Sequence, residues 1–128
     1  MRTPKLPRSV KPNHFVGSAR EELSEMPDDV KSVIGQAIFE AQCGGKSASA
    51  KPLKGFKGAG VLEVVENSDG DTYRAVYTVK FTGAVYTLCA FQKKSKKKAE
   101  TPKHIMDLVG HRLKLAEGDY RKRYPNIG

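Results

Sequence analysis

The chain has 128 residues, of which 23 are Lys or Arg and 14 are Asp or Glu, so its formal net charge is +9. This length fits one domain with a single modest core, and no apolar run approaches the ~20 residues that a membrane-spanning helix needs. The basic balance favours a polyanionic partner such as RNA, DNA, an anionic membrane surface or an acidic protein.

The N-terminal segment differs in composition from the rest of the chain. Residues 1–12 contain three prolines among basic side chains and are expected to form a mobile basic arm, followed by one domain over residues 13–124. The arm lacks the apolar segment of a secretory signal. Cys43 and Cys89 show neither metal-ligand nor disulfide spacing. A cytoplasmic protein with reduced thiols is therefore expected.

A short strand is expected at residues 13–17, and two helices follow it. Ser18 and Glu21 have the spacing of a capping box and open a short helix. Pro27 begins a second helix, which Gly44 and Gly45 end. Apolar residues recur in this second helix at helical spacing, which indicates one face packed on a sheet: Val30, Val33, Ile34, Ala37, Ile38 and Ala41.

Three strands are predicted after a loop at residues 46–60. Residues 61–66 and residues 73–81 flank a turn, and side chains alternate along the second of these segments. Residues 84–91 are apolar on both faces, which predicts a central strand. The simplest arrangement is two antiparallel hairpins that share the middle strand.

Motifs of metal-dependent and nucleotide-hydrolysing enzymes are absent from the sequence. There is no Walker-type phosphate loop. His14, His104 and His111 lack metal-ligand spacing, and the last two fall on a final helix that Thr101 caps and Pro102 begins. The carboxylates fall at helix starts and turns. We therefore expect no metal and no cofactor.

Three cationic segments are expected to meet on one side of the sheet, because adjacent strands lie about 5 Å apart. Their combined contacts with phosphates would depend strongly on salt. Beside them, Tyr86 and Phe91 either offer surfaces for base stacking or belong to the core. The segments are the loop with Lys51, Lys54 and Lys57, the strand with Arg74 and Lys80, and the run with Lys93, Lys94, Lys96, Lys97 and Lys98.

Such a cationic surface also suits RNA cleavage, since the 2′-OH of RNA is an internal nucleophile for the neighbouring phosphate. Arg74 fits a bidentate grip on phosphate oxygens. A lysine among other cations has its charged form disfavoured and can serve as a base. The residues by themselves support RNA binding more directly than cleavage.

The loop AKPLKGF, the strand YRAVYTV and the run AFQKKSKK followed by TPK are distinctive together. They resemble the phage-derived, HigB-like branch of the RelE/ParE toxin superfamily, and the resemblance extends from about Phe15 to about Leu115. It implies an α+β, RelE-like fold with an N-terminal helical hairpin, a small, mostly antiparallel twisted sheet and a C-terminal helix.

The resemblance also implies a toxin of a type II toxin–antitoxin system, an mRNA endonuclease that acts on the ribosome and leaves a 2′,3′-cyclic phosphate. Its partners would be mRNA and a cognate antitoxin with a helix-turn-helix domain. Cys89 stands where many relatives carry a His, which weakens any proton transfer from that position. The residues expected to act in catalysis are Arg74, Lys54, Lys93 and Lys94, and those expected to contact RNA are Lys51, Lys57, Lys80, Phe91, Lys96 and Lys97.

Two other functions fit the same residues. The superfamily includes DNA gyrase inhibitors that cut nothing, so a non-catalytic nucleic-acid binder or a ParE-like gyrase inhibitor is the alternative. A basic adaptor for an acidic protein segment also fits the net charge. Cations gathered on one concave face favour the nuclease, whereas scattered cations favour the adaptor.

Overall fold

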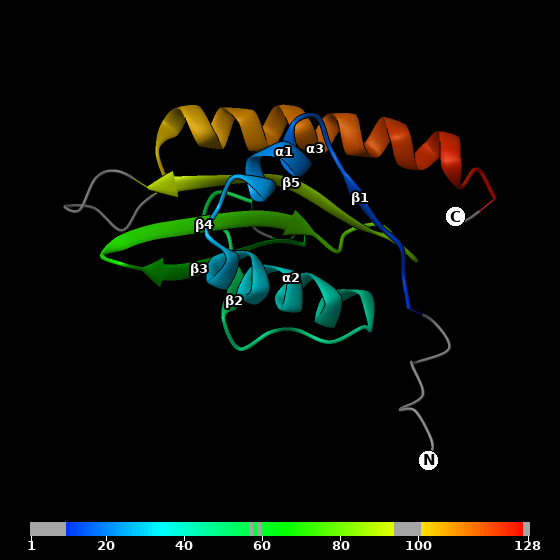
Figure 1. Cartoon of the computed structure of the whole chain (residues 1–128). Coiled ribbons are helices and arrows are strands. Elements are labelled where there is room, and N and C mark those ends of the chain that lie inside the picture. Colours follow the sequence, from blue (N-terminus) through cyan, green and yellow to red (C-terminus); the bar gives the residue numbers. More distant parts are fainter. Residues whose placement is uncertain (1–9, 57, 59, 94–100, 127–128) are drawn as a thin grey trace, which may run out of the picture.

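The computed structural model describes residues 10–56, 58, 60–93 and 101–126. Figure 1 shows three layers, with α2 on one side of a five-stranded sheet and α3 along the other. The N-terminal helices, the mostly antiparallel sheet and the C-terminal helix confirm the predicted α+β class. The elements are β1 (Asn13–Phe15), α1 (Ala19–Ser24), α2 (Asp28–Gln42), β2 (Ala50–Pro52), β3 (Val61–Ser68), β4 (Asp71–Thr78), β5 (Val85–Lys93) and α3 (Lys103–Arg123).

The sheet has the order β1-β5-β4-β3-β2. Its centre is the predicted antiparallel meander of β3, β4 and β5. Asp69 and Gly70 join β3 to β4 with positive φ angles of 52° and 83°, the conformation that a two-residue hairpin turn requires. Of the two short edge strands, β1 lies within the short strand expected at residues 13–17 and pairs with β5 in parallel. The other, β2, was not predicted and lies within the expected loop.

Each face of the sheet carries its own hydrophobic cluster. The alternation in β4 turns Tyr73, Ala75 and Tyr77 towards α2, whose predicted apolar face contributes Ile34 among other buried residues. Val76, from the opposite face, packs in the cluster under α3. Burying a side chain such as Ile34 contributes roughly 1.5–3 kcal/mol to stability. Both faces of the sheet are therefore interior.

One predicted strand boundary was wrong, and one feature of the sheet was not predicted. β4 ends at Thr78, so Val79 and Phe81 do not continue its alternation. β5 contains a β-bulge, because Val76 pairs with Cys89 while the next residue, Tyr77, pairs with Thr87. The extra residue re-aims the β5 side chains on either side of it, which a strict period of two does not anticipate.

The edge of β5 beyond β1 is covered by an ion pair between α1 and α3. Arg112 donates from both terminal nitrogens to the Glu22 carboxylate, at 2.8 and 2.9 Å, and also donates to the Leu88 carbonyl. Glu22 in turn accepts from the Ala90 backbone N–H. Side chains thereby satisfy backbone groups that an open edge would expose.

Contacts near the N-terminal helices refine the predicted boundaries. The capping box predicted at Ser18 was wrong, since this side chain makes no capping hydrogen bond. Lys11 exchanges hydrogen bonds with Gln42 at the end of α2, so the last residues of the expected arm contact the domain. Residues 1–9 of that arm lie outside the described residues. Within the part of the chain that the structure describes, no helix is long and apolar enough to cross a membrane.

Candidate functional site

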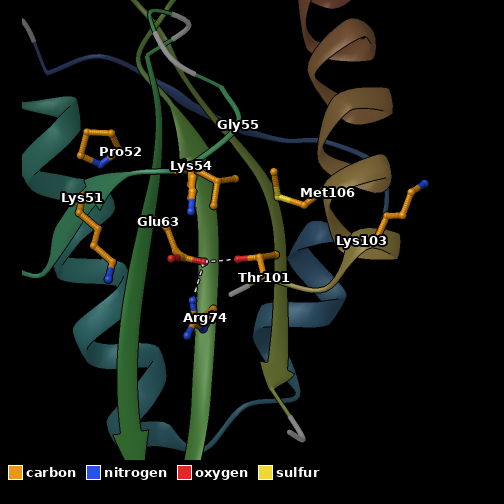
Figure 2. Close-up of a pocket in the computed structure, with 10 residues that line it drawn as sticks. Lys51, Pro52, Lys54, Gly55, Glu63, Arg74, Thr101, Lys103 and Met106 are labelled. Carbon is orange, nitrogen blue, oxygen red and sulfur yellow. Dashed lines mark hydrogen bonds and ion pairs between the residues drawn. The ribbon is translucent and has the colours of Figure 1, made fainter. Parts of the chain in front are cut away.

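A pocket lies between the chain around β2, the sheet and the start of α3, as Figure 2 shows. Its volume is about 710 Å³, within the range of sites that hold small ligands. Four separate stretches of the chain contribute to its lining. The lining residues are Lys51, Pro52, Leu53, Lys54, Gly55, Glu63, Arg74, Thr101, Lys103 and Met106.

Strand register brings the charged residues of this pocket together. Lys51 of β2 lies opposite Glu63 of β3, and residues directly opposite each other project to the same face. Arg74 of β4 lies opposite Val65, two positions along β3, so it is a diagonal neighbour of Glu63. The alternation that turns Tyr73 towards α2 therefore turns Arg74 towards the pocket.

Arg74 and Glu63 form a buried ion pair in the pocket. Nη1 of Arg74 donates to Oε2 of Glu63 at 3.0 Å, and the two side chains are 7% and 4% exposed. Burying either charge alone would cost several kcal/mol of solvation free energy. The attraction between the two charges offsets part of this cost. The pair therefore holds the Arg74 guanidinium at a fixed place in the pocket.

Thr101 takes part in the same network. It was expected to cap α3, but Pro102 occupies that position, and the Thr101 hydroxyl instead donates to Oε2 of Glu63 at 2.9 Å. The dashed lines of Figure 2 converge on this oxygen from both donors. The segment that enters α3 is thereby tied to β3.

The pocket also has an apolar side. Leu53 is almost fully buried, and Met106 extends from α3 towards Gly55. Gly55 has a φ of +100°, and a Cβ built there would lie 2.7 Å from the Met106 methyl carbon. The positive φ favours glycine here, and any side chain at this position would also displace the Met106 methyl group. Cationic and apolar surfaces therefore adjoin in one cavity.

Three of the predicted site residues meet in this pocket. Lys51 and Lys54 are exposed at its rim, and in Figure 2 both side chains extend towards the row that Glu63 and Arg74 occupy. Lys103, which was not predicted, lines the pocket from α3, but its ammonium is drawn pointing away and pairs with Asp107 at 3.2 Å.

Two predicted residues on β5 lie near Arg74 without lining the pocket described here. Phe91 lies opposite Arg74 in the register and is half-buried. It borders a smaller hollow of about 220 Å³ beside α1. Lys93 lies opposite Thr72, so it is a diagonal neighbour of Arg74. Its side chain is buried, with 8% of the residue exposed.

Lys80 and Tyr86 are placed elsewhere. The Lys80 ammonium lies 3.7 Å from Glu117 near the far end of α3, about 17 Å along that helix from Met106 at 1.5 Å per residue. Tyr86 is buried and donates to Asp119 at 2.7 Å, and burial, followed by this hydrogen bond, raises its pKa. Tyr86 is therefore a core residue and not a stacking surface.

Four predicted lysines lie outside the described residues: Lys57, Lys94, Lys96 and Lys97. They remain predictions.

Cys89 is buried under α3. Burial, followed by the negative charge of Glu22, raises the pKa of its thiol to about 12. The thiol therefore stays protonated at neutral pH and does not act as an ionised group.

Glu63, Thr101, Lys103 and Met106 were missed from the sequence. A weak signal for Glu63 existed, since it is a carboxylate at an inward position of an otherwise apolar strand, VLEVV. Among the described residues no group of three or more His, Cys, Asp and Glu side chains could hold a metal ion. The chemistry that the pocket offers is charge stabilisation and positioning of an anion.

Comparison with known proteins shows similarity to one family model and to solved structures. The model of the family described as phage-derived protein Gp49-like (DUF891) matches residues 21–114. Among solved structures, the chain is similar to one from the toxin–antitoxin complex RelBE2 of Mycobacterium tuberculosis, with 19% sequence identity and a TM-score of 0.46. That similarity covers 66% of this chain and 99% of the other. No curated protein matches.

Proposed function

The chain belongs to the phage-derived Gp49-like family, and from this premise we propose that it is a RelE-like toxin of a type II toxin–antitoxin system that cleaves mRNA. One structural observation supports the choice of RNA as the ligand. Lys51, Lys54 and Arg74, which are distant in the sequence, line a single cavity. A grouped set of cations is what a phosphate backbone requires.

The proposed reaction is internal transfer of the phosphate. The 2′-oxygen attacks the neighbouring phosphorus, the bond from phosphorus to the 5′-oxygen breaks, and a 2′,3′-cyclic phosphate and a 5′-OH end result. Arg74 holds the phosphate in line, and Lys51 stabilises the charge that develops on its oxygens. Lys54 moves the proton between the attacking and leaving oxygens.

The apolar side of the pocket supports the same assignment. Leu53 and Met106 adjoin the cations, so a base can lie against them while its phosphate meets Arg74. The described cationic rim is open to a single-stranded segment. We propose mRNA on the ribosome as the substrate, a cognate helix-turn-helix antitoxin as the partner, and the cytoplasm as the location.

A translation reaction with purified protein tests the proposal, with primer extension to map cuts in the message. Arg74→Lys keeps a positive charge beside Glu63 but loses the planar fork, so cuts should become at least ~100-fold rarer. Lys80→Gln, a cation outside the pocket, should cut as the unmodified protein does, and circular dichroism checks each fold. An intact message with arrested DNA supercoiling would instead identify a gyrase inhibitor.

A further inference from the structure

A buried carboxylate in a pocket for anions calls for an explanation. Glu63 is 3% exposed, yet the cationic side chains of Lys51, Lys54 and Arg74 share its cavity. These three cations and one carboxylate give a net formal charge of +2, since the Lys103 ammonium points away and pairs with Asp107. A phosphate bound by Arg74 would therefore lie close to a negative charge as well.

We propose that Glu63 sets the charge selectivity of the pocket, shifting it from doubly charged terminal phosphates towards the singly charged internal linkage of RNA. The inference rests on the proposed function and names its substrate class more closely. It makes Glu63 a specificity-determining residue that acts through its charge, and it assigns the carboxylate no proton transfer.

The physical reason is that electrostatic energy scales with the product of the two charges. An internal phosphodiester carries one negative charge, whereas a terminal monoester carries about 1.5 to 2 at neutral pH. A carboxylate beside the bound phosphate therefore repels a dianion about twice as strongly as a monoanion at the same place. Because Glu63 is buried, salt screens this repulsion less than it screens a surface charge.

This selectivity has a use in an RNA-cleaving site. Free nucleotides and RNA ends carry terminal phosphates, and a pocket of uncompensated cations would bind them in preference to internal linkages. Glu63 weakens that preference while Thr101 and Arg74 hold its carboxylate in place. The Lys51 and Lys54 ammonium groups remain available to the internal phosphate at the rim.

The experiment compares two ligands that differ by one methyl group. One is a 2′-O-methyl nucleoside 3′-phosphate, a dianion, and the other is its phosphate methyl ester, a monoanion; neither can be cleaved by attack of a 2′-OH. Calorimetry at low salt and about pH 7.5, where the terminal phosphate is mostly dianionic, gives both dissociation constants for the full chain and its variants.

Glu63→Gln keeps one acceptor oxygen, which can serve both Arg74 and Thr101, but removes the charge. We expect the methyl ester to bind about fivefold more tightly and the dianion about 25-fold, the square of that factor. Glu117→Gln, which removes a carboxylate outside the pocket beside Lys80 and Arg121, should leave the ratio of the two constants unchanged. An equal gain for both ligands in Glu63→Gln, or no gain, overturns the inference.

Two further variants keep the outcome decisive. Glu63→Asp retains the charge, so the ratio of the two dissociation constants should equal that of the unmodified protein. A ratio equal to that of Glu63→Gln would show that the shape of the side chain, and not its charge, causes the effect. If Glu63→Gln does not fold, Lys51→Gln replaces it in the experiment. Lys51 lies opposite Glu63 in the strand register and is exposed, so this variant changes the charge beside the same bound phosphate. In that variant, the fold-increase in the dissociation constant of the dianion must be the square of the fold-increase for the monoanion. Equal fold-increases for the two ligands overturn the inference.

The two proposals fail in different ways. If neither ligand binds the unmodified protein, the proposed function itself loses its support. If both ligands bind and Lys51→Gln weakens them, but Glu63→Gln leaves their ratio unchanged, only the role of Glu63 is wrong.

Discussion

Nη1 of Arg74 and Oε2 of Glu63 lie 3.0 Å apart on neighbouring strands, in a pocket whose rim is cationic. An arginine that served only to attract RNA would be exposed, but this one is 6% exposed. The ion pair therefore belongs both to the interior of the domain and to the candidate site. Substitutions here change stability and binding together, and the two effects must be measured separately.

Replacement of one partner of this pair should be more destabilising than replacement of both. Arg74→Met leaves the Glu63 charge buried alone, so the free energy of unfolding should fall by about 3–5 kcal/mol. The double variant Arg74→Met/Glu63→Leu removes both charges and should regain most of that loss. Urea denaturation followed by circular dichroism measures both. A double variant no more stable than Arg74→Met would contradict the expectation.

The exposed lysines of the pocket should account for part of the salt dependence of RNA binding. Lys51→Gln and Lys54→Gln should each reduce the slope of log affinity against log salt by about 0.7 for single-stranded RNA, because each removes about one phosphate contact. Fluorescence anisotropy across a salt series gives the slopes. Lys80→Gln is the matched control, and a reduction in its slope as large as theirs would move the RNA contact away from the pocket.

Glycine at position 55 should matter to the pocket more than glycine at position 58. Both have a positive φ, so Ala is strained at either and should lower stability by about 1 kcal/mol or more. Only Gly55→Ala also meets Met106, whereas a Cβ at Gly58 has open space. RNA cleavage should therefore fall more in Gly55→Ala, and Met106→Ala should restore part of it. Equal losses in both glycine variants would count against the pocket as the site.

The stability of the domain should decrease below about pH 6.5 through His14, whose Nε2 lies 2.7 Å from the Tyr124 hydroxyl. Burial, followed by the positive charge of Arg123, lowers the pKa of His14, and the opposing effect of Asp119 is smaller. Between the lowered value and 6.5 the unfolded chain binds more protons, so stability rises with pH.

Thermal melting at pH 5 and pH 7.5 measures this dependence, and the drop on acidification should be smaller in His14→Gln than in the unmodified protein. Asp119 accepts hydrogen bonds from Tyr86 and Arg123, which outweigh burial and lower its pKa, so it stays ionised across this window. An identical drop in both proteins would show that another group titrates.

Much of the fold could be predicted from local patterns. Apolar residues at helical spacing identified α2, alternation identified β4, and the turn at Asp69 and Gly70 identified the hairpin between β3 and β4. These patterns are readable because backbone geometry repeats every 3.6 residues in a helix and every two in a strand. The net charge of +9 could also be read from the sequence, because it depends on composition alone. A charge of this sign favours an anionic partner.

Tertiary structure decided which of the predicted cations form the pocket and which other residues line it. Lys51, Lys54 and Arg74 meet because β2, which was not predicted, pairs with β3 in one register. The same pairing placed Glu63 among them, and the path of the chain after β4 carried Lys80 to the other end of α3. Composition records which charges a chain has, but strand register and helix packing determine the distances between them, and electrostatic chemistry depends on those distances.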